Sequence, residues 1–274
     1  MSPLPGWKTD PGGNVINPLL DLAARPVIGH RGASGEAPEN TLPAFELALA
    51  QGAHALELDV RVSADGVPLV LHDPALDRTT DRSGLLAMIS AAEAREADAG
   101  AQFTPDGGAT HPWRGRGVRI PTLAEVLDRF PETPLLIELK EAAAQNAVRQ
   151  LLLQRNASAR SVVASEDAAA LEAFRSPPFL VAASGEDIKR LYFGTLFGVA
   201  PATVPYRLLS VPVRHRGLPV PTRRFVRAAR RLGCPVHVWT VNQPGLASRL
   251  WQRGVCGIIT NVPEMVLREA RALG

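Results

Sequence analysis

The stretch PVIGHRGASGEAPENTLPAFELALAQGAHALELDV, residues 26–60, holds two short apolar runs separated by a longer helical pattern at 40–52. The runs are rich in Val, Ile and Leu, as strands buried on both faces of a parallel sheet are. A strand, a helix and a second strand in this order predict one unit of an α/β fold with parallel strands.

The same alternation continues to the end of the chain. Six further strand-like runs each precede a helical pattern: LLIELK (135–140), SVVASE (161–166), FLVAASG (179–185), LLSVPV (208–213), PVHVWTV (235–241) and GIITNVP (257–263). The run VPLVLHD (67–73) is interpreted as the second arm of a hairpin and not as a barrel strand. Eight strands predict an α/β fold of the closed (β/α)₈ type, a TIM barrel.

Two segments fall outside this pattern. Residues 77–120 mix one helical stretch with Gly, Pro and Asp, and we interpret them as a small inserted lobe after the second strand's hairpin. Residues 1–25 are rich in Pro and Gly and predict an N-terminal leader. The remaining Pro/Gly clusters are too short to be domain linkers, so residues 26–274 are expected to form one barrel domain.

The composition is that of an ordinary globular protein. Of 274 residues, 46% are hydrophobic and 21% are charged, so the chain is neither disordered nor fibrous and can bury a large core. The 30 basic and 27 acidic residues leave a net charge of only +3, so charge alone does not indicate a nucleic-acid partner.

Targeting signals are absent from the sequence as read. No apolar run approaches the roughly 20 residues of a membrane span, and the N-terminus lacks the basic and apolar regions of a signal peptide. We therefore expect a cytoplasmic protein without stable membrane insertion. Cys234 and Cys256 are too few for a disulfide scaffold and are expected to be reduced, buried thiols.

Charged residues occupy two of the predicted strands. In HALELDV, alternation places Glu57, Asp59 and Arg61 on one face. In LLIELK, Glu138 and Lys140 share a face in the same way. Charges inside a parallel strand are too costly unless they face a polar opening or a metal. Active sites of such barrels lie at the C-terminal ends of the strands, so we expect these groups to converge there.

The three carboxylates of Glu57, Asp59 and Glu138 would form an oxygen-rich site suited to Mg²⁺ or Ca²⁺. The alternative is a structural cluster in which these acids pair with Arg31 and Lys140. Three carboxylates at strand ends beside two imidazoles favour the metal site.

The hairpin is expected to bring a histidine to this site. Asp65-Gly66 is a strong tight-turn signal between its two arms. With the turn centred there, antiparallel register sets His72 opposite Asp59, and directly opposed residues share a face.

Four further side chains complete the predicted chemistry. His30 ends the first strand, and with His72 it would supply the two imidazoles of a general acid and a general base. Arg31 and Lys140 offer positive charge to a phosphate, Arg bidentately and Lys as a point charge. These groups together indicate phosphodiester cleavage, and either His could act first. The other histidines are expected to be ordinary hydrogen-bonding residues: His54, His111, His215 and His237.

The motifs that carry these residues resemble those of the glycerophosphodiester phosphodiesterase family. The resemblance covers residues 26–266 and rests on GHRGASGEAPENTLPAFELALAQGA, ELDVRVSADGVPLVLHD, LDRTT, IPTLAEVLDRF, IELK, VHVWTVN and GIITNVP. The stretches 98–117 and 186–207 depart from the family's pattern, and we expect them to shape the alcohol side of the substrate.

The resemblance implies an enzyme of glycerol and lipid metabolism that hydrolyses small-molecule glycerophosphodiesters to glycerol 3-phosphate and an alcohol through a cyclic phosphate. It implies Glu57, Asp59 and Glu138 as ligands of a divalent metal, Mg²⁺ or Ca²⁺. It also implies His30 and His72 as the acid–base pair and Arg31 and Lys140 as phosphate contacts.

Two residues keep alternative interpretations, and a third has a structural role. Glu39 would order its loop or support the metal. Trp239 would pack against the glycerol at the barrel opening or fill the barrel interior. Asn40 would cap the first helix, which begins at Asn40-Thr41.

Two rival functions are weighed against this one. The first is a lysophospholipase D or a phospholipase C-like enzyme acting on a lipid phosphodiester, for which FGTLFGVAP (193–201) is the only suggestive segment, and it equally fits a core helix. The second is not an enzyme but an anion- or nucleic-acid-binding protein that uses TRRFVRAARRLG (222–233). A solvated outer helix is the better interpretation of this segment, so no nucleic-acid partner is predicted. The sequence does not indicate an oligomeric state.

Overall fold

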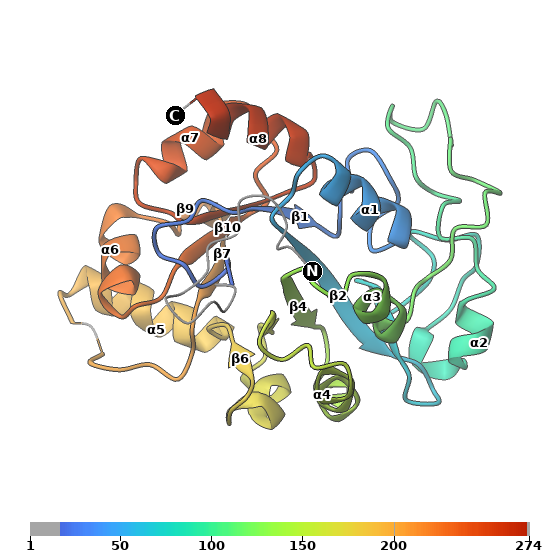
Figure 1. The fold of residues 1–274 in the computed structure, drawn as a ribbon, viewed down its shortest axis with the longest axis horizontal. Coiled ribbons are helices and arrows are strands. Elements are labelled where there is room, and N and C mark those ends of the chain that lie inside the picture. The colour runs from blue at the N-terminus through green and yellow to red at the C-terminus, as the bar shows by residue number, and fades with distance from the viewer. Residues whose placement is uncertain (1–16, 200, 273–274) are drawn as a thin grey trace.

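Eight parallel strands form the centre of the computed structural model, which describes residues 17–199 and 201–272 (Figure 1). The strands are β1 (Val27–His30), β2 (Ala55–Val62), β4 (Leu135–Leu139), β5 (Ser161–Ala164), β6 (Leu180–Val181), β7 (Leu209–Pro212), β10 (Val236–Trp239) and β11 (Gly257–Thr260). They run in the order β6-β5-β4-β2-β1-β11-β10-β7. A parallel bridge between Ala182 and Leu208 joins the two ends, so the sheet closes into the predicted barrel.

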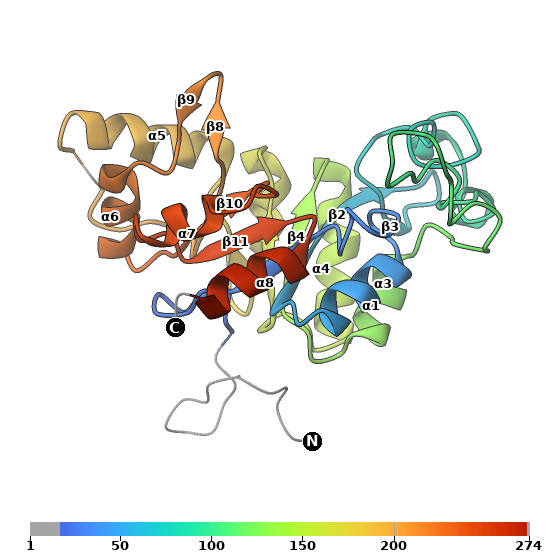
Figure 2. The ribbon, with the colours of Figure 1, turned by 90° about the horizontal axis from the view of Figure 1, so that it is seen from above.

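Most of the helices follow a strand and cover the outside of the barrel (Figure 2). They are α1 (Leu42–Ala50), α2 (Ala91–Ala94), α3 (Leu123–Arg129), α4 (Gln145–Gln154), α5 (Gly185–Leu196), α6 (Arg223–Arg231), α7 (Leu246–Trp251) and α8 (Pro263–Ala272). Three 3₁₀ segments are added, at Leu86–Met88, Ala142–Ala144 and Ala168–Phe174. Hydroxyl side chains cap several helices; Thr122 and Ser184 each form a capping box with the acid three residues on.

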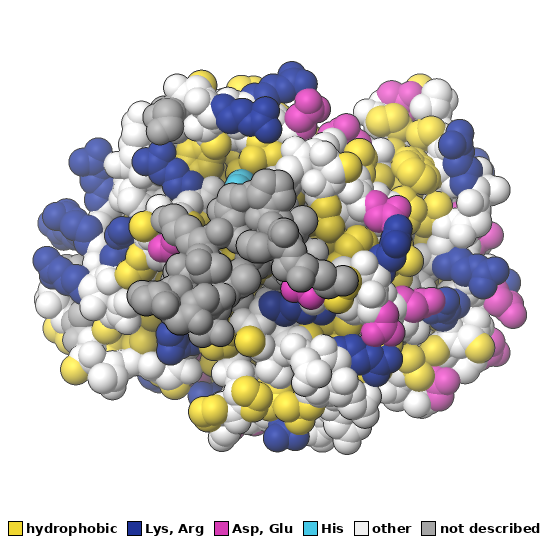
Figure 3. Space-filling view, in the orientation of Figure 1, with side chains coloured by type: hydrophobic (Ala, Val, Ile, Leu, Met, Phe, Trp, Pro, Cys, Tyr) yellow, Lys and Arg dark blue, Asp and Glu magenta, His cyan; other side chains and the backbone are white. Residues whose placement is uncertain are grey.

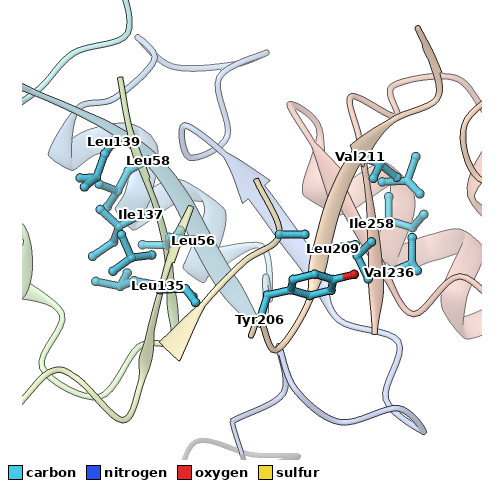
Figure 4. Close-up of a cluster of buried hydrophobic side chains, with 14 of the residues drawn as sticks. Leu56, Leu58, Leu135, Ile137, Leu139, Tyr206, Leu209, Val211, Val236 and Ile258 are labelled. Carbon is cyan, nitrogen blue, oxygen red and sulfur yellow. The ribbon is translucent and has the colours of Figure 1, made fainter. Parts of the chain in front are cut away.

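Outward-facing strand residues pack against the helices and form the main core. Leu56 and Leu58 of β2 and Ile137 of β4 gather on one side of the barrel, and Val211 of β7 and Ile258 of β11 gather on the other (Figure 4). All five are fully buried. The near-continuous apolar sequence of these strands is explained by burial on both faces.

The lower part of the barrel interior is filled by a separate apolar cluster. It contains Ile28, Ala55, Leu136, Val162, Ala164, Ala182, Leu208 and Ile259 from the strands, together with Leu19. Leu19 precedes the first strand and is 0% exposed. Its carbonyl oxygen lies 2.8 Å from Nε2 of the buried His237 on β10. Residues 17–25 therefore seal the end of the barrel where the strands begin, which we call the base, and the opposite end is called the mouth.

The hairpin differs from prediction by one residue of register. β3 (Pro68–Val70) pairs with β2 so that Val60 faces Val70, and the backbone N–H of Leu71 donates to the carbonyl of Asp59. Asp59 is therefore opposite Leu71 and not His72, and the expectation was wrong. The reason is a three-residue loop closed by Gly66 at φ +76°, where a two-residue turn had been expected.

The segment between β3 and α3, which contains residues 77–120, carries its own small apolar cluster. Leu69, Leu76, Leu86, Val118 and Ile120 are among its buried members. This cluster is distinct from the barrel core, and the segment extends to one side of the barrel in Figure 2.

Outside the barrel, α6 agrees with its prediction as a solvated outer helix. Phe225, Val226 and Ala229 are buried, while the arginines face outward. Dark-blue side chains gather over this helix at the left of Figure 3. Two short strands, β8 (Arg214–His215) and β9 (Leu218–Pro219), form a small hairpin that the sequence did not indicate.

Two smaller findings concern the sulfur groups and the membrane. Cys234 and Cys256 are both free and buried, as expected. Among the helices of the described ranges, none combines the length and the apolar character needed to cross a bilayer.

Candidate active site

The acidic residues predicted as metal ligands converge at the mouth. In the strand register, Asp59 on β2 pairs with Glu138 on β4, and His30 on β1 pairs with Glu57 on β2. Glu57, Asp59 and Glu138 each offer one ligand atom, and these atoms lie within 4.8 Å of one another. The alternation of β2 and β4 thus delivers three carboxylates to one point at the C-terminal ends of the strands.

The electrostatics of this acidic group favour a cation. Burial, together with the charges of Asp59 and Glu138, raises the pKa of Glu57 well above its usual range. Burial also raises the pKa of Glu138, against the opposing charge of Lys140. A bound cation would remove the repulsion among these groups, and carboxylate oxygens are the donors that hard divalent ions prefer. The acidic group therefore fits a divalent metal.

Two basic residues partly neutralise the acids. Arg31 Nε lies 2.8 Å from Asp59 Oδ2, and Lys140 Nζ lies 2.9 Å from Asp59 Oδ1 and 2.7 Å from Glu138 Oε1. Burial alone would raise the pKa of Asp59, but these two cations hold it below its usual range. The ion pairs of the alternative interpretation are thus present, and they coexist with the acidic group.

Asn40 contributes a contact that the sequence reasoning missed. Its side-chain amide donates to Asp59 Oδ2 at 2.9 Å, and its Oδ1 accepts from the backbone N–H of Asp59. The helix cap is Thr41, whose hydroxyl accepts from the Ala44 N–H, so the expectation of an Asn40 cap was wrong. Both residues suit a cap, and sequence alone did not separate them.

The turn after β1 has a constrained backbone. Arg31 has φ +56°, a conformation that costs energy for residues other than glycine and is often found at functional sites. Its backbone N–H donates to Glu57 Oε2 at 2.9 Å. Gly32 follows at φ +84°, and a Cβ there would lie 2.5 Å from the backbone of Ala44. Close packing of α1 on this turn therefore requires glycine and fixes Arg31 beside the acids.

His30 is oriented by a residue from the last strand. Its Nδ1 lies 2.7 Å from Oδ1 of Asn261, which directly follows β11. Burial, with a smaller contribution from the charge of Arg31, lowers the pKa of His30 to about 4. The imidazole is therefore neutral near pH 7, with its proton on Nδ1 facing Asn261 and its Nε2 able to accept a proton. Asn261 was not singled out from the sequence, because its 231-residue separation from His30 gives no local signal.

His72 follows the hairpin and is paired with its neighbour in the chain. Its Nδ1 lies 2.6 Å from Oδ1 of Asp73. The hydrogen bond from Arg78 to Asp73 is the largest cause that lowers the pKa of Asp73 to about 2. Neither residue was assigned a role from the sequence, although Asp73 and Arg78 stand in the HD and LDRTT segments.

Glu39 joins the cationic side of the site and lies outside the acidic group. Its carboxylate accepts from Arg31 Nη1 at 2.8 Å and from both terminal nitrogens of Arg78. Burial opposes ionisation of Glu39, but the contacts with Arg78 and Arg31 lower its pKa below the usual range.

A cavity of about 440 Å³ opens beside the acidic group. Its wall includes Glu138, Trp239, Ile188, Tyr192, Phe193 and Leu218. Trp239 is half-buried; it lines this cavity and also packs on the interior cluster. Part of the stretch 186–207 forms the wall, whereas 98–117 contributes nothing to it.

Comparisons with known proteins agree with one another. The model of the glycerophosphoryl diester phosphodiesterase family matches residues 30–265. The protein YhdW of Bacillus subtilis (strain 168) is 34% identical over 252 residues, which are 89% of this chain and 98% of that protein. A glycerophosphodiester phosphodiesterase of Caldanaerobacter subterraneus subsp. tengcongensis is 29% identical, over 90% of this chain and 98% of the relative.

Solved structures with the same fold include two informative cases. The glycerophosphoryl diester phosphodiesterase domain of Rv2277c from Mycobacterium tuberculosis has a TM-score of 0.81 and 25% identity, covering 90% of this chain and 99% of that chain. A phosphodiesterase of Oleispira antarctica, solved with its product sn-glycerol-3-phosphate, has a TM-score of 0.69 and 26% identity, covering 90% and 97%.

Proposed function

Because this chain belongs to the glycerophosphoryl diester phosphodiesterase family, it is a phosphodiester hydrolase, and we propose that it converts glycerophosphodiesters to glycerol 3-phosphate and an alcohol. The observation that carries the proposal is the convergence of Glu57, Asp59 and Glu138 at the mouth. The product complex of the Oleispira antarctica relative supports the glycerol 3-phosphate half of the reaction.

We propose that Glu57, Asp59 and Glu138 hold a divalent cation, Mg²⁺ or Ca²⁺. Such a cation would neutralise phosphate charge and lower the pKa of a bound hydroxyl. Arg31 and Lys140 would then contact the phosphate, because each already lies at the acidic group and carries a charge that the phosphate can share. Trp239 would pack against the glycerol from the cavity wall.

The two histidines are proposed to divide the proton transfers. His30 begins neutral and removes the proton of the glycerol 2-hydroxyl through Nε2. The hydroxyl oxygen attacks phosphorus, the bond from phosphorus to the alcohol oxygen breaks, and His72 gives a proton to that oxygen. Water then opens the cyclic phosphate with the two roles exchanged. The contacts of the rings support this division. Oδ1 of Asn261 accepts from Nδ1 of His30 and leaves Nε2 to accept a proton, and the Asp73 carboxylate lies 2.6 Å from Nδ1 of His72, a contact that orients the imidazole of an acid–base pair.

The lipid-acting alternative is not favoured, because the family and the Caldanaerobacter relative are glycerophosphodiester phosphodiesterases. One observation still bears on it. The described part of the segment 193–201, which omits residue 200, is not a core helix: Phe193, Leu196 and Phe197 are exposed, and Phe193 belongs to the cavity wall. A lysophospholipid is therefore included in the test below.

The test is a coupled assay of glycerol 3-phosphate release with glycerophosphocholine, glycerophosphoethanolamine and glycerophosphoglycerol. The metal-free protein receives Mg²⁺, Ca²⁺ or EDTA, and lysophosphatidylcholine is assayed separately for choline release. We expect metal-dependent glycerol 3-phosphate from at least one diester. Turnover that persists in EDTA, or of lysophosphatidylcholine alone, would contradict the proposal.

A further inference from the structure

We propose that Asp73 and Arg78 are positioning residues that hold His72 in the orientation needed to protonate the leaving alcohol. The inference rests on the proposed acid–base role of His72 and extends it to two residues that would act through its ring. It gives a function to the first residues after β3, from Asp73 to Arg78.

The first step is the contact between His72 and Asp73. At 2.6 Å, the carboxylate oxygen holds the proton of the imidazole on Nδ1. The other nitrogen, Nε2, is then the one that can serve the reaction. The backbone of His72 is fixed separately, because Arg61 Nε donates to its carbonyl oxygen at 2.8 Å. Ring and backbone are therefore held by different residues.

The second step is the contact between Asp73 and Arg78. Arg78 Nε lies 2.5 Å from Asp73 Oδ2, and its Nη2 lies 3.3 Å from Oδ1. This two-point contact fixes the plane of the carboxylate, which a single hydrogen bond would leave free to rotate. The plane matters because Oδ1 is the oxygen that His72 faces.

The third step connects Arg78 to the phosphate side of the site. Its Nη1 and Nη2 donate to the two carboxylate oxygens of Glu39 at 2.8 and 2.7 Å. Glu39 also accepts from Arg31, which is paired with Asp59. Arg78 thus contacts two carboxylates: that of Asp73, which bonds His72, and that of Glu39, which bonds Arg31. Because Arg78 bonds both, it sets the distance between the carboxylates of Asp73 and Glu39.

The chain holds Arg78 in place through its neighbours. Leu76 is buried, an isolated bridge pairs Ala75 with Leu85, and the Thr80 hydroxyl donates to the carbonyl of Leu76. The Arg78 side chain is 46% exposed, and ion pairs at such exposure add little to stability. Its two ordered contacts are therefore better explained by orientation of the site than by folding.

The test uses leaving groups that differ in their need for an acid. An alkyl alcohol requires protonation as it departs, whereas p-nitrophenol leaves as a stable anion. Asp73→Asn and Arg78→Ala are compared with the wild-type enzyme on glycerophosphocholine and on glycerophospho-p-nitrophenol. Arg82→Ala is the matched control, because Arg82 lies in the same segment, is 45% exposed and pairs with Glu96.

We expect Asp73→Asn and Arg78→Ala to lower kcat on glycerophosphocholine about 30-fold, a part of the 10²–10⁴ that a general acid contributes. On the p-nitrophenyl substrate, the rate of p-nitrophenol release in the first turnover should fall by less than about 3-fold, since the departing anion needs no acid. This readout precedes the opening of the cyclic phosphate, in which His72 acts again. In a His72→Ala background, Arg78→Ala should cause no further loss, because its effect passes through the missing ring.

Three outcomes would overturn the positioning role. Arg78→Ala could behave as Arg82→Ala does, it could reduce both substrates equally, or its effect could multiply with that of His72→Ala. Thermal unfolding of each variant identifies a folding defect. Arg78→Lys keeps the charge but cannot contact both carboxylates, so it should show the same dependence on the leaving group as Arg78→Ala. If His72→Ala itself retains activity, the acid–base assignment fails instead, and this result is distinguishable from the other three.

Discussion

The mouth and the base of this barrel contain the same buried group in opposite circumstances. Burial is the largest cause that lowers the pKa of both His30 at the mouth and His237 at the base to about 4. His30 is held by the side chain of Asn261 and lies among charged residues. His237 is held by the backbone carbonyl of Leu19 and lies in an apolar surrounding.

The difference shows that a perturbed pKa does not by itself identify a reacting group. A Cβ at Gly257 would lie 2.0 Å from Nδ1 of His237, so the ring packs directly on that glycine and leaves no room for a ligand. At the base, the imidazole of His237 bonds the N-terminal segment, whereas at the mouth Asn261 holds Nδ1 of His30 and leaves Nε2 for the proposed proton transfer. Access and partners, more than the size of the shift, separate the two functions.

The strongest test of this comparison is removal of the imidazoles at the mouth. His30→Ala and His72→Ala should each lower kcat by about 10³-fold, within the range for loss of a general acid or base. Melting temperatures should change little. A variant of either residue that retains activity would show that its imidazole is not part of the reaction.

The base should respond in the opposite way. Leu19→Ala removes a fully buried side chain from the interior cluster and should lower the free energy of unfolding by about 2–5 kcal/mol. The kcat of the folded enzyme should be unchanged. Urea denaturation combined with a steady-state assay measures both, and a stable but inactive variant would show that the two ends are coupled.

Lowering the pH should destabilise the protein through His237, which lies at the base of the barrel. Its folded-state pKa of about 4 lies below the unfolded value of 6.5, so the unfolded chain binds the proton first as pH falls between these values. Stability is therefore lost on acidification, by about 2 kcal/mol from this residue between pH 7.5 and pH 5.

The matched variant for this effect is His237→Gln, which cannot take up the proton. Its urea midpoint should fall less than that of the wild type between pH 7.5 and pH 5. Equal falls in the two proteins would mean that other groups, His30 among them, account for the acid sensitivity.

The smallest expected effect concerns the shape of the charged group of Lys140 at the mouth. Lys140 Nζ lies between Asp59 and Glu138 on a side chain that is only 14% exposed. The planar fork of arginine does not fit between these acids as an ammonium does, so Lys140→Arg should lower kcat/KM about 10-fold. Lys8→Arg is the control with no expected change, and Lys8 lies outside the described residues. Wild-type kinetics for Lys140→Arg would show that charge alone is sufficient at this position.

The sequence predicted the features that depend on local periodicity. Alternation along β2 and β4 was enough to place Glu57, Asp59 and Glu138 together, because strand geometry fixes which side chains share a face. The eight strands were found for the same reason. The predicted hairpin register was wrong by one residue, because the sequence does not distinguish a two-residue loop from a three-residue loop. The backbone conformation of Gly66 decides between them.

The residues that were missed depend on contacts between distant segments. Asn261 reaches His30 only after the ring of strands has closed, and Arg78 reaches Glu39 at a sequence separation of 39. Leu19 belongs to a segment with no helical or strand periodicity, so nothing in its sequence indicated that it fills the barrel. Family motifs included Asp73 and Arg78 but gave them no role.

Closure of the barrel also determines when the enzyme can become active during its synthesis. β1 pairs with β11, Leu19 bonds His237 across 218 residues, and His30 bonds Asn261 across 231. Contacts of such long range form late in folding, because the entropy of closing a long loop is lost before they contribute. A ribosome-bound chain that still lacks β11 therefore has all three carboxylates but lacks the Asn261 side chain that holds His30, the proposed catalytic base. Activity arises in one event, when the last strand docks beside the first.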